Sequence, residues 1–199
     1  MTNRRISLGW VCLVLLIAEG MLVIVSWLLS ATMMEGVRSL LSSEGIRWFF
    51  GSYTDMMASP LLVWLLLMLS ALGCLQQSGV VGLFSQEGRF TYRERIALRV
   101  ASIFLIIYIV IIALLTLMPH AILLSSTGDL FPSAFSRSLV PVVAFGIILF
   151  SGTFGVMSGR LRTLSGLLQS VSFGIAKGAP LVITLILLIQ LVESILFVF

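Results

Sequence analysis

The sequence predicts an all-α integral membrane protein: one transmembrane domain over residues 1–199, built as a bundle of five spans with an outer and an inner amphipathic surface helix. Three observations predict this class. Hydrophobic residues make up 59% of the chain and charged residues only 10%, whereas a soluble domain has about 25% charged residues. The apolar residues form five runs, each long enough to cross roughly 30 Å of hydrocarbon. None of these runs alternates polar with apolar residues, as the strands of a membrane β-barrel do.

The first run covers residues 7–31 and follows Arg4 and Arg5. A basic start before an apolar stretch is also typical of secretory signal peptides, but their apolar part is only about 7–15 residues long. The longer run therefore predicts a retained first span. Glu19 lies close to the middle of it, where an ionised carboxylate costs at least about 3 kcal/mol.

An outer surface helix is predicted over residues 37–50. Its apolar residues, Trp48 and Phe49 among them, are mixed with Arg38, Glu44 and Arg47. A helix with one apolar and one charged face lies in the membrane interface, and aromatic rings are typical of the headgroup level.

The second run, residues 60–84, contains a short polar stretch between two glycines: Gln76, Gln77 and Ser78. Small and polar residues let membrane helices approach closely, so the preferred interpretation is a face that packs against another helix. The alternative is a locally unwound segment that contacts a substrate or an ion.

The third and fourth runs cover residues 98–124 and 139–158, with an outer loop predicted over residues 125–138 because glycine, proline and serine are frequent there. The fourth run carries small residues at four-residue spacing, namely Ser151, Gly155 and Gly159. This spacing predicts a helix-packing or dimer face, with a bound lipid or substrate as the alternative.

The fifth run covers residues 180–199 and follows an inner surface helix predicted over residues 161–175. Gly178 and Pro180 predict a break between the two. Glu193 lies inside the run, and Gln190, one helical turn away, is its predicted hydrogen-bond partner. Glu19 and Glu193 are each interpreted as a carboxyl bonded across helices, with an ion or proton site as the alternative.

The basic residues predict the orientation. With the N-terminus inside, three of the 12 Lys and Arg residues lie outside, and nine lie inside: Arg4, Arg5, Arg89, Arg93, Arg95, Arg99, Arg160, Arg162 and Lys177. Because positive charge favours the cytoplasmic side, we expect a bacterial inner-membrane protein with its N-terminus inside and its C-terminus outside.

The sequence contains no motif typical of catalysis or metal binding. There is no CxxC, no Cys/His cluster and no nucleotide-binding or hydrolase motif, so we expect no enzyme activity, no metal and no cofactor. Cys12 and Cys74 lie in apolar runs and are interpreted as small buried hydrophobic residues. The lone His120 is interpreted as interfacial. The net charge of +4 is distributed between the apolar runs, which argues against nucleic-acid binding.

One segment resembles a known family. Ser39–Trp48, SLLSSEGIRW, is similar to a stretch of the p-aminobenzoyl-glutamate transporter (AbgT) family that precedes a helix with a glycine-rich end. Ala71–Val80 matches that end, keeping Gly73, Ser78 and Gly79 but with Gln76 in place of a glutamate. Gly155–Arg162 resembles the family's later turn, and Gln190 lies where its last span has a glutamine.

The resemblance implies the scaffold and dimerisation part of such a transporter. Family members are longer dimers whose mobile core contains re-entrant hairpins, and the sequence shows no counterpart of the polar hairpin tips. We therefore expect a dimerising scaffold or accessory subunit in the bilayer, paired with a second copy or a separately encoded transport core. The alternative is a compact transporter of p-aminobenzoyl-glutamate-like or drug-like organic anions, with Glu19, Gln76, Gln77 and Glu193 lining a cavity.

Overall fold

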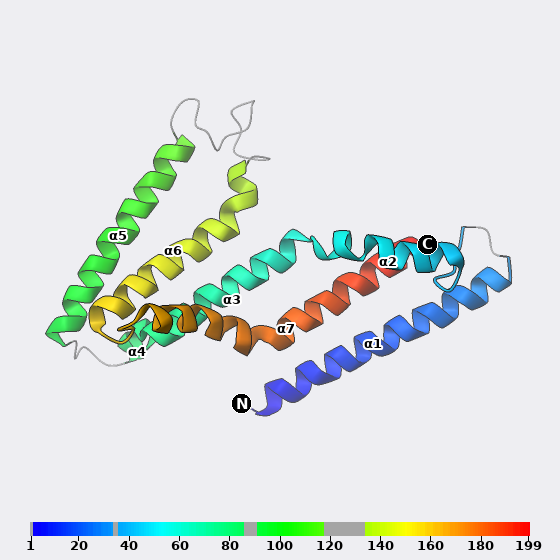
Figure 1. Ribbon diagram of the computed structural model, residues 1–199, viewed down its shortest axis with the longest axis horizontal. Coiled ribbons are helices and arrows are strands. Elements are labelled where there is room, and N and C mark those ends of the chain that lie inside the picture. The colour runs from blue at the N-terminus through cyan, green and yellow to red at the C-terminus, as the bar shows by residue number, and fades with distance from the viewer. Residues whose placement is uncertain (1, 34–35, 86–90, 118–133) are drawn as a thin grey trace. The chain divides into compact units, whose positions relative to one another are not determined.

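The computed structural model describes residues 2–33, 36–85, 91–117 and 134–199, and the described residues form helices and no strand (Figure 1). The helices are α1 (Thr2–Ala31), α2 (Ser43–Met57), α3 (Pro60–Ser78), α4 (Val80–Ser85), α5 (Tyr92–Leu117), α6 (Ala134–Ser158) and α7 (Leu164–Val198). Five of them contain segments long and apolar enough to cross a membrane: Leu8–Ala31, Pro60–Ser78, Tyr92–Thr116, Ser138–Ser158 and Leu164–Val198. The predicted all-α class with five long apolar helices is therefore confirmed.

The chain divides into two compact units. The first comprises Met1–Val63 and Gly178–Phe199, and the second comprises Trp64–Lys177. The boundaries between the units fall inside α3 and α7.

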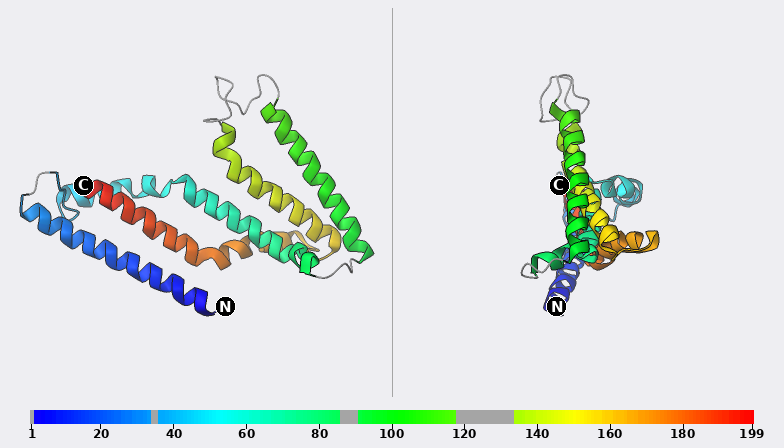
Figure 2. Two further views of the ribbon diagram at one scale, coloured as in Figure 1. Left: turned by 180° about the vertical axis from the view of Figure 1, so that it is seen from behind. Right: turned by 90° about the vertical axis from the view of Figure 1, so that its left-hand side faces the viewer.

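In the first unit, α1 runs alongside the C-terminal part of α7, and α2 lies against the end of α7 (Figures 1 and 2). The Ser42 hydroxyl accepts a hydrogen bond from the Gly45 amide at 3.0 Å and so caps the start of α2. The segment before α2 is anchored twice, because the Leu40 amide donates to Ser26 Oγ and the Arg38 amide donates to the Val198 carbonyl.

In the second unit, α3 contacts the first part of α7 through two glycines. A Cβ on Gly73 would overlap the Gly174 backbone, and a Cβ on Gly174 would overlap the carbonyl of Leu69. Beside this contact, α5 and α6 lie side by side (Figure 2), and the Tyr108 hydroxyl of α5 donates to the Val142 carbonyl of α6 at 2.9 Å. A small core gathers residues of α4, α5 and α6: Val80, Leu83, Ala97, Ala101 and Phe154.

The predicted second span, residues 60–84, is not one helix. It ends at Ser78, the chain turns at Gly79 with φ of +84°, and α4 follows. Only glycine adopts this backbone region without strain. Ser78 Oγ donates to the Leu75 carbonyl, and this hydroxyl also lies 3.4 Å from the Val80 amide that begins α4.

The predicted break before the last span is wrong, because α7 continues unbroken through Gly178 and Pro180. Proline at position 180 removes the backbone donor to the Ala176 carbonyl, and membrane helices tolerate such a loss when neighbouring groups or local adjustments satisfy the freed carbonyl. One turn later, the Thr184 hydroxyl donates to the Pro180 carbonyl at 2.7 Å. Most of the segment predicted as an inner surface helix and nearly all of the predicted last span therefore belong to one helix, α7.

Other helix ends also differ from prediction. The predicted outer helix begins at Ser43 rather than residue 37, since Ser42 is its cap. The third apolar helix begins at Tyr92, after the Thr91 amide donates to the Glu94 carboxylate at 3.0 Å. Residues 134–138, predicted as loop, are the start of α6, and they contain no glycine or proline to stop a helix. The rest of that predicted loop and residues 118–124 of the predicted third span lie outside the described residues, as does His120.

Candidate functional site

A row of polar contacts joins α1 to α7 inside the first unit; we call it the α1–α7 seam. Ser194, only 1% exposed, donates to Glu19 Oε1 at 3.1 Å. Gln190, one turn earlier on α7, is a second hydrogen-bond partner of the Glu19 side chain. Seven residues before Glu19, Cys12 Sγ lies 3.2 Å from the Thr184 hydroxyl. The seam therefore consists of Cys12, Glu19, Thr184, Gln190 and Ser194.

The seam contains some of the residues that the sequence singled out, but in pairs that differ from those predicted. Gln190 contacts Glu19 rather than its predicted partner Glu193, which faces a different surface. Sequence reasoning did not single out Thr184 and Ser194. Their spacing held a signal, because Ser194 lies four residues after Gln190 and so occupies the same helix face.

The polar stretch of the second unit does not form one site. Gln76 Oε1 accepts a hydrogen bond from Lys177 Nζ at 3.0 Å, and the ammonium of Lys177 lies 5.7 Å from the ring centre of Phe173. Gln77 is exposed, while Ser78 is fully buried and donates to its own helix. The three side chains therefore have three different environments.

The small residues of α6 contact other parts of the same unit. A Cβ on Gly155 would come within 2.5 Å of Leu161 and 3.4 Å of the Cα of Ser78. Gly159 has φ of +81° and ends the helix beneath the Arg93 guanidinium. Ser151 is fully buried and donates to the Ile147 carbonyl at 2.6 Å. Two of the three residues are thus covered by their own chain, and the third forms the helix end.

A charged pocket of about 450 Å³ lies where α2 meets the end of α7 in the first unit. Its lining combines two cations, two carboxylates and three apolar side chains: Arg38, Glu44, Arg47, Trp48, Glu193, Leu196 and Phe197. Trp48 and Phe197 stack with ring centres 4.2 Å apart and planes 20° from parallel. Sequence reasoning noticed Glu193 and the mixed character of the outer helix separately, and their meeting was not predicted.

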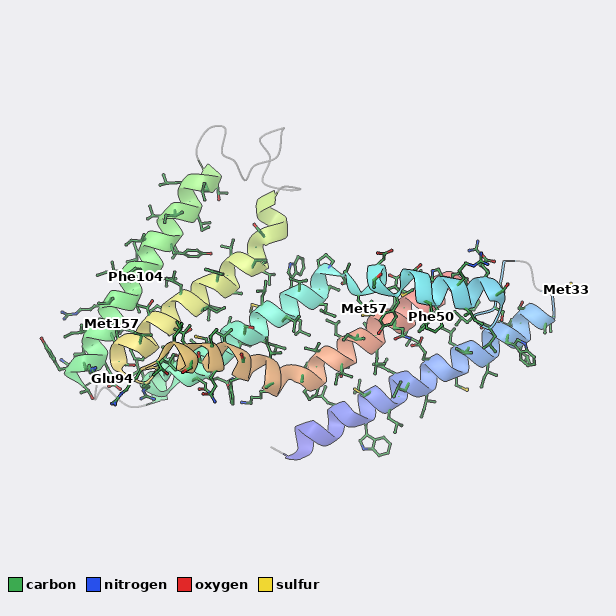
Figure 3. The ribbon with its side chains drawn as sticks, in the orientation of Figure 1. Met33, Phe50, Met57, Glu94, Phe104 and Met157 are labelled. Carbon is green, nitrogen blue, oxygen red and sulfur yellow. The ribbon has the colours of Figure 1, made fainter. Side chains whose placement is uncertain are left out.

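A second charged cluster lies near Gly79 and Gly159 in the second unit. Arg160 pairs with Glu94 at 3.6 Å and covers Gly79 with its side chain. The Glu94 carboxylate is labelled in Figure 3, at the start of α5. This cluster brings together the ends of α3 and α6 and the starts of α4 and α5.

Metal binding receives no support from the described part of the chain, where no group of three or more His, Cys, Asp or Glu side chains converges. In the residues that the structure describes, no buried side-chain nitrogen or oxygen atom lacks a hydrogen-bond partner. The chain matches no protein-family model, no curated protein and no solved structure.

Proposed function

We propose that this chain is a multi-pass membrane scaffold, a subunit that holds helices together and offers apolar surfaces to lipid and to a partner, rather than a subunit that carries substrate. One observation carries the proposal: several hydroxyls in the apolar helices donate to carbonyls of their own helix, whereas Ser194 donates to Glu19 on α1. The donor–acceptor pairs are Ser26–Val23, Thr116–Ile112, Ser151–Ile147, Ser170–Leu167 and Thr184–Pro180. A transport route needs polar groups that are free to bind substrate near the middle of the membrane.

The outward face of α1 supports the same function. Six apolar side chains recur at steps of four and three residues and are each between 57% and 64% exposed: Trp10, Val14, Ile17, Met21, Ile24 and Leu28. Leu16, also 57% exposed, lies outside this row. Glu19 lies on the opposite side of the helix, toward α7. A wide apolar face of this kind is suited to contact with lipid or with a second membrane protein.

The second unit offers comparable faces. Phe104 on α5 and Met157 on α6, labelled in Figure 3, are 49% and 40% exposed. Since Gly155 is already covered within the chain, dimerisation would use these large side chains rather than the small residues of α6.

The bilayer position follows from the same reasoning. We place α2 at the outer headgroup level, because Phe50 is 77% exposed on a helix that also carries Glu44 and Arg47. The N-terminus of α1 is then cytoplasmic, in agreement with the distribution of basic residues. The resemblance of Ser39–Trp48 to the p-aminobenzoyl-glutamate transporters points to a scaffold related to that family.

A compact transporter is the second candidate, favoured by the Glu19–Ser194–Gln190 group. This group places a carboxyl, a hydroxyl and an amide together about 17 residues after the start of α1, at a depth where a polar side chain is expensive.

Native mass spectrometry of the full chain, extracted from its own membranes in a mild detergent, tests the scaffold. The expected result is retention of a second copy or of another membrane subunit, with no uptake of p-aminobenzoyl-glutamate by proteoliposomes of the chain alone. A monomer that takes up this compound, and loses uptake in Glu19→Gln but not in the control Asp55→Asn, would establish the transporter instead.

A further inference from the structure

The charged pocket of the first unit has two halves that differ in how their charges are balanced. Arg38 and Glu44 form an ion pair at 3.9 Å. Arg47 and Glu193 line the same pocket, but neither forms an ion pair with any residue that the structure describes. The pocket therefore presents one cation and one carboxylate that are available to a ligand.

Aromatic side chains form part of the lining of this open pocket. Trp48 of α2 stacks on Phe197 of α7, and the Arg38 guanidinium lies 5.8 Å from the Phe197 ring centre. The backbone bond from the Arg38 amide to the Val198 carbonyl holds the segment before α2 against α7. This part of the lining thus comes from three segments that are already fixed to one another. A volume of about 450 Å³ falls within the range of small-ligand pockets, about 300–1,000 Å³.

The apolar surface continues from the pocket along α7. Leu196 lines the pocket and is 68% exposed, and Val192 and Phe199 on the same helix end are 46% and 71% exposed. A ligand whose charged part occupies the pocket can therefore extend a hydrocarbon part along exposed side chains.

We propose that this pocket binds the headgroup of a zwitterionic phospholipid with a primary ammonium group, the chemistry of phosphatidylethanolamine. The phosphate accepts hydrogen bonds from the planar guanidinium of Arg47. The ammonium donates to the carboxylate of Glu193. The acyl chains lie along Leu196 and Val192, toward the middle of α7.

The charges select among headgroups. A phosphoglycerol headgroup offers no cation to Glu193, and a phosphocholine headgroup carries a cation without an N–H donor. A free zwitterion such as glycerophosphoethanolamine matches both charges but has no acyl chains. This inference concerns a lipid site on the chain and holds whether the protein is a scaffold or a transporter.

Lipid retention by the purified full chain tests the proposal. Native mass spectrometry would compare phosphatidylethanolamine, phosphatidylcholine and phosphatidylglycerol with identical acyl chains, and also soluble glycerophosphoethanolamine. Because only phosphatidylethanolamine can satisfy both charges and bury its acyl chains, we expect it to bind about tenfold or more tightly than the other ligands.

Substitutions of pocket residues test whether the pocket causes the preference for phosphatidylethanolamine. Arg47→Gln and Glu193→Gln should each reduce the preference for phosphatidylethanolamine by about tenfold, while the charge-exchanged double variant R47E/E193R should recover part of it. Matched controls are Arg95→Gln and Asp55→Asn, which remove an exposed charge outside the pocket and should leave the preference unchanged.

Three results would overturn the proposal. The first is equal binding of the three phospholipids, and the second is a preference that survives in both pocket variants. The third is binding of glycerophosphoethanolamine as tight as that of the intact lipid, which would assign the pocket to a soluble zwitterion. Thermal unfolding of each variant, measured alongside, separates loss of lipid from loss of fold.

Discussion

Inside each unit, the contact between neighbouring helices is of a different kind. In the first unit, α1 and α7 meet through polar side chains, with Glu19 bonded to Ser194 and Cys12 close to Thr184. In the second unit, α3 and α7 approach at Gly73 and Gly174 with no side chain between their backbones, and the Lys177–Gln76 hydrogen bond adds to this contact. Close backbone contact relies on dispersion and tolerates no added atom, whereas a side-chain hydrogen bond allows a looser fit. We therefore expect substitutions at the glycine contact to cost much more than substitutions at the polar seam.

The largest effect is expected for Gly174→Ala. The added methyl would overlap the Leu69 carbonyl, and overpacking of this kind typically costs about 1–3 kcal/mol. We expect the upper end of that range, because the obstacle is backbone. Unfolding of the purified protein in a detergent titration measures the loss. The control is Gly82→Ala, where nothing lies within 4 Å of the added atom; an equal loss in both variants would refute the close contact.

Gly79→Ala should have the next largest effect. The residue has φ of +84° and is covered by the Arg160 side chain, so alanine introduces backbone strain of about 1–3 kcal/mol. We expect the loss of unfolding free energy to lie in the lower half of this range, since the arginine side chain can move. The same unfolding measurement applies, with Gly51→Ala in the middle of α2 as the control. A stabilised Gly79→Ala would mean that α3 and α4 form one continuous helix.

Ser194→Ala tests the polar α1–α7 seam of the first unit. It removes the donor to Glu19, and hydrogen bonds between membrane helices average only about 0.6 kcal/mol. We expect a loss below about 1 kcal/mol, clearly smaller than that of Gly174→Ala. Ser30→Ala on α1 serves as the control. A loss larger than that of the glycine variant would reverse the ranking of the two units.

The smallest effect is expected for Glu44→Gln. The Arg38–Glu44 pair spans 3.9 Å, and its side chains are 62% and 70% exposed, so the pair should contribute no more than about 0.5 kcal/mol. Thermal unfolding at low and high salt is the measurement, since any contribution of an exposed pair should weaken as salt increases. A salt-independent loss near 2 kcal/mol would show that the pair is not exposed in the membrane.

Several elements were predictable from the sequence because their cause is local. Length and apolarity predicted the five long helices, whereas the helix predicted from residue 37 ran through Ser42, the residue that caps the start of α2. The interruption at Gly79 was considered only as an alternative, since glycine in a membrane helix is compatible with a turn, a close contact or neither. The continuity of α7 was missed because Pro180 was interpreted by the rule for soluble helices.

The sequence by itself determined that this chain is built of long apolar helices, because hydrocarbon requires each backbone segment to satisfy its own hydrogen bonds. Tertiary structure alone decided which polar groups meet. Glu19 and Ser194 are 175 positions apart. Helical periodicity tells which face of its helix each residue occupies, but not which other helix packs against that face. For the same reason, only the fold brought Arg47 and Glu193 to one pocket.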